Sequence, residues 1–333
     1  MINSFEAKNF RLFDKVKIDR LNRVNLIVGK NNAGKTALLE ALLLYLSRMS
    51  VEVIPKFLDA RQEYWLPEQP YGGKSSSPLM HFFKGHKIPN LDEEGFRLSS
   101  NEEDPIHVGT GAYLQEDPAD LKRLAGIGRK NTMVGQGVNT RKYQFVSARG
   151  ISDEESSSLW DRISLTDLEE DLLKGLRIIE PELLGLTFVR IDHDVEHHYR
   201  APSRIPLVRP NRVSDPVPLK SLGDGMIRIF HIILSLVSAK GGILLIDEFE
   251  NGLHWEIQEK AWRIVFELAE KLDIQVFATT HSRDCIAGFS KVWQENAEKG
   301  AFIRIAKDHY KTVITEYDTE LLSDSLEMDT EVR

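Results

Sequence analysis

The chain has 333 residues, of which 41% are apolar, so it is long enough for one large domain or two ordinary ones with a sizeable core. Its net charge of −8 argues against a protein coated by nucleic acid, because such binding relies on neutralising phosphates. The longest apolar stretches, residues 37–46 and 227–237, are too short to cross a bilayer, no signal peptide is recognisable, and the single cysteine, Cys285, suits a reducing compartment, so we expect a cytoplasmic protein without membrane contact.

The first fifty residues predict strands followed by a buried helix. Alternating apolar residues at 2–10 and 15–18 predict a hairpin, and residues 24–28 predict a short buried strand. A glycine-rich loop comes next. Leucines on nearly every face then predict a buried helix from Lys35 to about Arg48.

Residues 50–142 differ from the rest of the chain. Clusters of glycine, serine and acidic residues interrupt any long periodic pattern there. We expect these residues to form a loop-rich and partly helical module with short strands, inserted into the domain formed by the rest of the 333 residues.

Regular structure resumes in residues 143–218, the expected second lobe. Thr166 followed by Glu169 has the spacing of a capping box, which starts an amphipathic helix. The expected elements are a strand at 143–146, a helix at 165–179, a strand at 186–192 and a proline- and arginine-rich linker at 201–218.

The last part, residues 219–333, alternates strands with helices. Such alternation with apolar strands indicates an α/β fold whose parallel sheet is covered on both faces. The expected elements are a helix at 224–238, a strand at 243–246, a helix at 254–271, strands at 274–279, 302–305 and 312–317, and a short final helix.

Residues 29–36, with the sequence GKNNAGKT, fit the phosphate-loop pattern and stand between an apolar strand and a helix. Backbone N–H groups of such a loop point at phosphates, and the helix N-terminus adds its positive dipole end. Lys35 is expected to reach the terminal phosphates and the Thr36 hydroxyl to ligate Mg²⁺. The pattern predicts ATP binding, with the phosphates cradled by Asn31, Asn32, Ala33 and Gly34.

Two carboxylates end the apolar strand at 243–246. The strand ends of a covered parallel sheet meet at one edge, where ligands bind. Asp247 is therefore expected to be the second magnesium anchor, and Glu248 to orient or deprotonate the attacking water. The alternative, a surface pair that caps the following helix, is disfavoured by the phosphate loop upstream.

Two further segments belong to this expected edge. His281 closes the strand at 274–279, and we expect it to sense the terminal phosphate. Residues 221–225, with the sequence SLGDG, start the helix that precedes the acidic strand. Alone they are an ordinary helix start, but a second phosphate-binding N-terminus makes sense if it serves the nucleotide of another subunit.

These segments, in this order, resemble the ATP-binding-cassette (ABC) ATPases, and more closely the soluble branch with RecF, the structural-maintenance-of-chromosomes (SMC) proteins and the ATPase half of OLD-family nucleases. Residues 29–36 match their Walker A motif, 243–248 their Walker B motif with its catalytic Glu248, and 221–225 their signature motif. The resemblance implies that Ser221 and Gly223 contact a nucleotide and that His281 is the switch histidine.

The same resemblance implies a phosphate-loop NTPase fold of the ABC-ATPase head type, with a mixed sheet flanked by helices. Residues 250–254 stand at the D-loop, and Arg11 corresponds to an arginine that approaches the nucleotide. Gln144 is a candidate for the Q-loop, although a neighbour in a core strand is the simpler interpretation. The sequence lacks the heptads of a long coiled coil.

We therefore expect a Mg²⁺-dependent ATPase that dimerises around two nucleotides and controls a partner. The resemblance implies an effector protein such as a nuclease or toxin, or a nucleic acid, in DNA repair or anti-phage defence. Only the basic runs within residues 122–149 and 200–212 offer support from the sequence, and a solvated surface is the simpler interpretation of them.

Two alternatives stay open. A transporter ATPase subunit would need a Q-loop and a transporter-type signature motif, which are weak or missing here. An ATP-dependent nuclease would need a metal site, for which the acids at 92–94 and 102–104 in the insertion are candidates. His193, Asp194, His197 and His198 form another dense group, in which His193 and His197 would have metal-ligand spacing on a helix, although the strand expected just before them disfavours a helix there.

Overall fold

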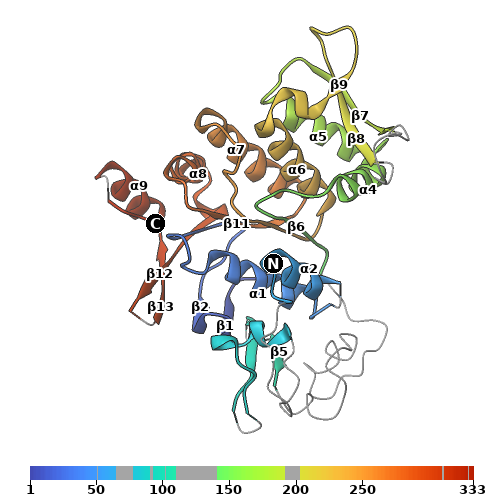
Figure 1. Cartoon of the computed structure of the whole chain (residues 1–333). Coiled ribbons are helices and arrows are strands. Elements are labelled where there is room, and N and C mark those ends of the chain that lie inside the picture. Colours follow the sequence, from blue (N-terminus) through green and yellow to red (C-terminus); the bar gives the residue numbers. More distant parts are fainter. Residues whose placement is uncertain are drawn as a thin grey trace.

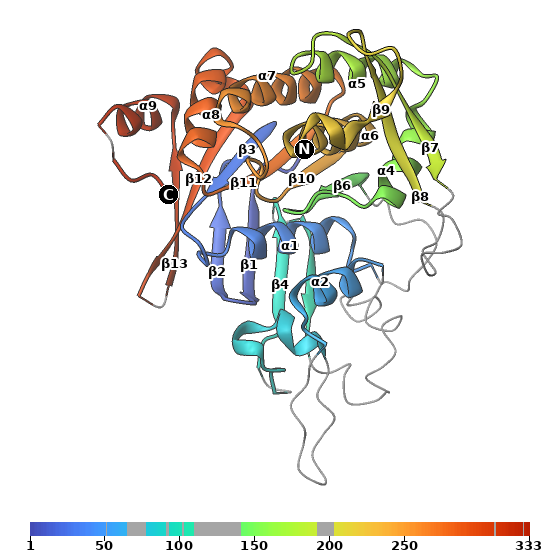
Figure 2. The same cartoon turned by 45° about the horizontal axis from the view of Figure 1, so that its top comes forward.

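The computed structural model describes residues 1–50, 52–64, 78–90, 93–101, 103–109, 141–191, 203–309, 311–328 and 330–333. A six-stranded sheet, in the order β13-β12-β3-β11-β10-β6, crosses the middle of the molecule (Figures 1 and 2). Its strands pair in parallel except for β13, which is antiparallel to β12. They are β3 (Val24–Val28), β6 (Tyr143–Val146), β10 (Ile243–Ile246), β11 (Gln275–Thr280), β12 (Gly300–Asp308) and β13 (Lys311–Tyr317).

Both faces of this sheet are buried, because apolar residues occupy successive positions of its inner strands. In β10, Leu244 and Ile246 belong to one apolar cluster, whereas Ile243 and Leu245 belong to another on the opposite face. Successive side chains of a strand point to opposite faces, so a continuous apolar run requires cover on both sides. This arrangement confirms the mixed α/β sheet flanked by helices that the sequence predicted.

One face is covered by the N-terminal lobe, which lies below the sheet in Figure 2. A four-stranded antiparallel sheet, in the order β2-β1-β4-β5, packs there beside α1, which is buried along nearly its whole length as expected. The elements of this lobe are β1 (Phe5–Phe10), β2 (Phe13–Ile18), α1 (Lys35–Leu46), α2 (Val53–Arg61), η1 (Pro78–Phe82), η2 (Lys84–His86), β4 (Phe96–Ser100) and β5 (Glu103–Val108).

The expected insertion at 50–142 is therefore less separate than its composition indicated. Its strand β4 pairs with β1, with Phe5 opposite Ser100 and Lys8 opposite Arg97, so it extends the sheet that the N-terminal hairpin begins. The sequence indicated short strands here but not their pairing with β1, because this pairing joins residues far apart in the sequence. The central part of the insertion, residues 110–140, lies outside the described residues.

The other face is covered by α6 (Asp224–Ser238), α7 (Trp255–Lys271) and α8 (Arg283–Glu295), which lie above the sheet in Figure 2. The second lobe adjoins α6 through α4 (Asp153–Ile163) and α5 (Asp167–Arg177). The remaining elements are β7 (Leu183–Ile191), β8 (Ser203–Pro210), β9 (Val217–Pro218), η4 (Leu219–Leu222), η5 (Ala297–Lys299) and α9 (Thr319–Glu327).

The second lobe corrects one expectation and confirms another. The linker expected at 201–218 is wrong over residues 203–210, because these form β8, antiparallel to β7. The prolines of this segment argued against a strand. Only Leu207 and Val208 of β8 pair with β9 as well as with β7, so Pro206 and Pro210 lie where β8 has a single neighbouring strand. A strand tolerates proline at such positions, because no second neighbour needs its missing N–H group. The predicted cap of α5 is present, since Thr166 Oγ1 accepts a hydrogen bond from the Leu168 amide.

Helix α4 was missed by the sequence analysis, although its start carries the same signal. Ser152 caps it by accepting a hydrogen bond from the amide of Glu155, three residues later. Among the described residues, no helix combines the length and the apolar character needed to cross a membrane.

Candidate nucleotide site

The phosphate loop joins the end of β3 to the start of α1, and two of its glycines leave no room for a side chain. A Cβ atom on Gly29 would lie 2.4 Å from the carbonyl oxygen of Ile305, and one on Gly34 would lie 2.8 Å from the ring of Phe13. Gly34 also has a φ of 116°, which L-residues with side chains rarely adopt. The close packing of the loop therefore depends on glycine at both positions.

The start of α1 carries no side chain that would neutralise it. Gly34 caps α1 without a side-chain hydrogen bond, and the first turn of α1 holds no acid, so the helix N-terminus keeps its positive end free for a ligand. Lys35 donates hydrogen bonds to the carbonyl oxygens of Gly29 at 2.7 Å and Lys30 at 3.1 Å. Burial lowers the pKa of the Lys35 ammonium, against the opposing effect of Glu250 and the other nearby acids. Asn31 and Asn32 are exposed beside it.

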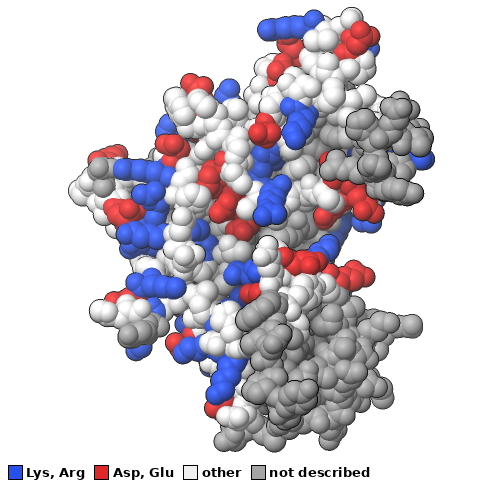
Figure 3. All heavy atoms as spheres, viewed as in Figure 1, with Lys and Arg blue, Asp and Glu red and all other residues white. Residues whose placement is uncertain are grey.

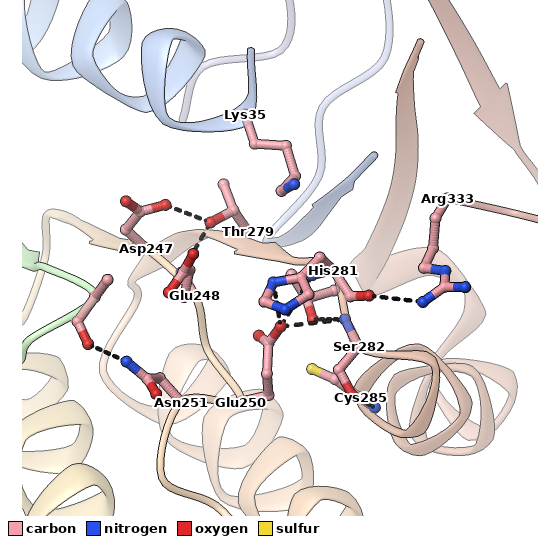
Figure 4. Close-up of polar contacts among 12 residues, drawn as sticks. Lys35, Asp247, Glu248, Glu250, Asn251, Thr279, His281, Ser282, Cys285 and Arg333 are labelled. Atoms are coloured by element: carbon pink, nitrogen blue, oxygen red, sulfur yellow. Dashed lines mark hydrogen bonds and ion pairs between the residues drawn. The ribbon is translucent and has the colours of Figure 1, made fainter. Parts of the chain in front are cut away.

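Thr36 and Asp247, the two predicted magnesium ligands, lie side by side although they are far apart in the sequence. The Thr36 hydroxyl lies 3.3 Å and 3.2 Å from the two carboxylate oxygens of Asp247. Thr279, on the adjacent strand β11, donates a hydrogen bond of 2.6 Å to Asp247 Oδ1 (Figure 4). The Asp247 carboxylate is thus held between the start of α1 and strand β11.

Glu248 follows directly and has a left-handed backbone, with φ of 50°. Such a conformation costs energy in a residue with a side chain, and it persists where neighbouring groups hold it. The Thr279 hydroxyl accepts a hydrogen bond from the Glu248 amide at 2.9 Å. From α6, Arg228 Nη2 donates to the carbonyl oxygens of Asp247 and Glu248, both at 2.7 Å.

Arg228 is buried, and burial lowers the pKa of its guanidinium to about 10. Its other terminal nitrogen donates to the carbonyl oxygen of Ser147, which follows β6. This single side chain therefore connects the signature helix α6 to the backbone of both acidic residues and to the next strand of the sheet.

His281 follows β11 and is held by Glu250. Oε1 of Glu250 accepts hydrogen bonds from the amides of His281 at 2.9 Å and Ser282 at 3.1 Å, and it lies 3.1 Å from Nδ1 of His281. The Glu250 side chain is only 10% exposed, whereas that of His281 is 45% exposed. Figure 4 shows the carboxylate beneath the ring, with Lys35, Asp247 and Glu248 around the same edge.

The signature segment lies at the start of α6. Ser221, Gly223 and Asp224 are exposed, and Gly223 caps α6 with no side-chain hydrogen bond. Gly225 packs on the segment that follows Walker B, because a Cβ there would lie 3.0 Å from the carbonyl oxygen of Gly252. A cavity of about 580 Å³ adjoins both segments and is lined in part by Lys220, Asp224, Arg228 and Asn251.

Arg11 lies elsewhere in the lobe, at the turn between β1 and β2. It is buried, with its Nε 2.6 Å from Glu40 of α1 and its Nη1 2.8 Å from Glu63. Its Nη1 also donates to the carbonyl oxygen of His81 at 3.3 Å, and the guanidinium lies over the ring of Phe82, so the loop at 29–36 is not among the contacts that the described part of the chain gives it. Gln144, the Q-loop candidate, lies in β6 opposite Leu244 of β10.

The other sequence-based candidates do not form a site among the described residues. Glu93 and Glu94 are exposed, whereas Asp92, Glu102 and residues 193–198 lie outside the described residues, as do the side chains of Glu103 and Asp104. In the second basic run, Arg204 pairs with Asp161 and Arg212 with Glu182. Acidic and basic side chains alternate over the face shown in Figure 3, as expected of a solvated surface.

Sequence reasoning gave no individual role to three residues of this edge, Arg228, Glu250 and Thr279. Glu250 carried the strongest available signal, since it stands two positions after Glu248 in a segment already matched to the D-loop. Arg228 and Thr279 stand in an apolar helix and an apolar strand, where a buried polar residue must find a hydrogen-bond partner.

Comparison with protein families supports the interpretation of both halves of the chain. Residues 143–284 match the family model described as "AAA domain, putative AbiEii toxin, Type IV TA system", and residues 1–103 match the one described as "AAA ATPase domain". A Helicobacter pylori protein named ATP/GTP phosphatase is 22% identical over 344 residues, which cover 89% of each chain. Uncharacterized protein MJECL10 of Methanocaldococcus jannaschii is 40% identical over 87 residues, 26% of this chain and 38% of that protein.

Solved structures show where the fold belongs. The head of an SMC protein bound to the C-terminal winged-helix domain of ScpA has a TM-score of 0.55 and 13% identity, covering 97% of this chain and 99% of that one. The Pyrococcus furiosus SMC head with an extended coiled coil has a TM-score of 0.51 and 12% identity, covering 98% and 99%. The predicted resemblance is confirmed: the chain is an ATPase that matches AAA-type ATPase domains over residues 1–103 and 143–284 and has the fold of an SMC head.

Proposed function

We propose that this ATPase is an ATP-operated switch, in which two copies enclose two nucleotides and thereby control a partner. Each phosphate loop would face the Ser221–Gly223 segment of the other copy. The observation that carries this proposal is the exposed, uncapped start of α6. A helix N-terminus attracts phosphate, and a second one makes sense at an ATP site if it belongs to another subunit.

The oxygens of Thr36 and Asp247 fit a magnesium ion. A hydroxyl and a carboxylate within 3.3 Å of each other are the ligand types that Mg²⁺ prefers, and the usual remaining ligands are phosphate and water. When bound, magnesium would neutralise negative charge on the phosphates. In this proposal Lys35 leaves the carbonyl oxygens of its own loop and binds the terminal phosphates, which replace those hydrogen bonds with stronger charged ones.

Glu248 would accept a proton from the attacking water, or orient it, because its carboxylate follows the magnesium-binding residue at the same strand end. His281 would donate a hydrogen bond to the terminal phosphate from the ring nitrogen that Glu250 leaves free. The alternation between bound and released phosphate then changes which groups hold the two copies together, as the switch requires.

Partner control has support of two kinds. The similar SMC head was solved with a bound domain of ScpA, so a head of this fold can present a protein-binding surface. The family model matched by residues 143–284 takes its description from a toxin–antitoxin system, which supports an effector protein in cytoplasmic defence over nucleic-acid repair. The paired arginines of the second basic run offer little to a nucleic acid.

The variant Glu248→Gln tests the dimer. It should bind ATP, hydrolyse it at least about a hundredfold more slowly, and double its mass in multi-angle light scattering with ATP and Mg²⁺. Adding Ser221→Arg to this variant should return the monomer mass, because an exposed side chain at the start of α6 then obstructs the facing nucleotide while ATP binding to the phosphate loop remains. ADP in place of ATP is the second control. A Glu248→Gln protein that stays monomeric with saturating ATP would refute the proposal.

A further inference from the structure

Glu63, His81 and His86 form a second cluster, away from the nucleotide edge. Each offers a ligand atom, and these atoms all lie within 4.8 Å of one another. Nδ1 of His81 and Nδ1 of His86 are 2.9 Å apart. No other group of three or more histidine, cysteine, aspartate or glutamate side chains meets this condition in the part of the chain that the structure describes.

The backbone around the cluster is shaped to bring these side chains together. Gln62 ends α2 in a left-handed conformation, with φ of 57°, and the amide of Glu63 donates to the carbonyl oxygen of Leu58 at 2.8 Å, which turns Glu63 back over the helix. His86 is also left-handed, with φ of 55°. A left-handed residue is a common way to end a helix, and histidine adopts this conformation more readily than most residues, so both positions tolerate the turns that bring the three side chains together.

We propose that Glu63, His81 and His86 bind one divalent transition-metal ion of the zinc class. Two imidazoles with one carboxylate suit Zn²⁺ and Co²⁺, whereas Mg²⁺ and Ca²⁺ prefer oxygen ligands alone. Two nitrogens bound tetrahedrally at about 2.0–2.1 Å lie about 3.4 Å apart, so the histidine pair needs to open by about half an ångström. His86 is exposed, which gives an ion access and leaves a fourth position to water.

The surroundings determine how tightly such an ion binds. Arg11 Nη1 lies 2.8 Å and 3.1 Å from the two oxygens of Glu63, and Arg61 Nε donates to Glu40 at 2.7 Å. The two arginines already balance the two glutamates, so a bound dication would add charge that no further acid of this group offsets. An ionised carboxylate offers about four lone-pair sites, and Arg11 leaves part of them to a metal. We expect a micromolar dissociation constant.

The same pairs connect the metal site to the phosphate loop. Glu40 lies on α1, the helix that begins with Lys35 and Thr36, and Arg11 bridges Glu40 to Glu63. A metal that takes electron density from the Glu63 carboxylate would weaken the ion pair between Glu63 and Arg11. The ion pair between Arg11 and Glu40 would then become the stronger of the two. The ion would therefore act on the packing of α1 without touching the nucleotide.

Isothermal titration of the untagged, chelator-treated chain with ZnCl₂ tests the site, with Co²⁺ absorption as a report on geometry. We expect one ion per chain for the unaltered protein and for His309→Ala, a control at an exposed histidine elsewhere. His86→Ala, whose altered side chain is exposed, should weaken binding at least tenfold. Glu63→Gln, which keeps an oxygen for Arg11, should weaken it by a smaller factor, with folding checked by circular dichroism.

Three results would overturn the proposal. The first is no stoichiometric binding by the unaltered protein, which would leave the histidine pair as a hydrogen bond only. The second is unchanged binding by His86→Ala. The third is binding that survives His86→Ala and disappears in His197→Ala, which would place the ion in the other histidine group. ATP hydrolysis measured with Mg²⁺ in each variant keeps this outcome separate from that of the proposed switch.

Discussion

The phosphate loop and the acidic side of the nucleotide site reach the same sheet edge by different routes. The loop is one run of residues, 29–36, in which backbone amides and Lys35 are the proposed phosphate ligands and glycines keep the loop close to its neighbours. The acidic side combines Asp247, Glu250 and His281 from the ends of two strands and a loop, held by Thr279 of β11 and Arg228 of α6. One side depends on local sequence and the other on tertiary contacts.

This difference decides how each side should respond to substitution. In the proposed site, a change at Lys35 removes a group that meets phosphate directly, so its effect should fall on nucleotide binding. A change at Arg228 or Glu250 acts through other residues, because these side chains position a backbone or a ring instead of meeting the nucleotide. The effects of substitutions at these two positions should be smaller, and they should depend on the residue that each side chain holds.

Lys35→Ala tests the loop and should have the largest effect. Removal of a charged donor from the terminal phosphates should weaken ATP binding by at least about a hundredfold and abolish hydrolysis at ordinary ATP concentrations. Titration with a fluorescent ATP analogue measures the loss. Lys30→Ala is the matched control, since Lys30 is an exposed lysine of the same loop. Equal affinity of the Lys35→Ala and unaltered proteins would contradict the assignment.

The same contrast explains what the sequence could predict. Lys35, Thr36, Asp247 and Glu248 follow from strand–loop–helix and strand-end patterns that are contiguous in the chain, and the structure brings Thr36 and Asp247 together. The positions of Arg228 and Thr279 depend on which helix and which strand pack beside β10, a choice that a single sequence does not carry.

Two features that the sequence analysis did not predict, the strand β8 and a cluster of side chains, share a physical cause. The strand β8 was taken for a linker because its prolines are local signals, whereas its pairing with β7 is a long-range one. The cluster of Glu63, His81 and His86 was missed for the same reason, since nothing in the spacing of these residues indicates that α2 and two short helices bring them together.

His231 tests the tertiary side through stability. It lies on α6 one turn from Arg228, and burial, with a smaller effect of Arg228, lowers its pKa to about 4 from an ordinary 6.5. Below about pH 6.5 the unfolded chain therefore binds a proton at His231, whereas the folded chain binds it only below about pH 4. Stability is complete above this window and falls as the pH falls through it, by about 2 kcal/mol at about pH 5 and about 3 kcal/mol below pH 4.

Urea unfolding at about pH 7.5 and about pH 5 measures this loss. His231→Gln keeps an acceptor for the amide of Ile151 but does not titrate, so its stability should change less between the two pH values. His254→Gln, at an exposed histidine, should behave as the unaltered protein does. The same pH dependence in His231→Gln as in the unaltered protein would show that another group is responsible.

Glu250→Gln has the smallest expected effect and tests the acidic side most directly. Its amide oxygen can still accept from the amides of His281 and Ser282, so the backbone should keep its place, but the negative charge beside Nδ1 of His281 is lost. Loss of one charge-assisted contact should lower kcat about tenfold with little change in KM. If Glu250 acts only by positioning His281, the substitution should cost almost nothing further in a His281→Ala background. Additive losses in this double-mutant cycle would mean that Glu250 acts on the reaction independently of His281. The proposal that Glu250 positions the His281 ring for a hydrogen bond to the terminal phosphate would then be wrong.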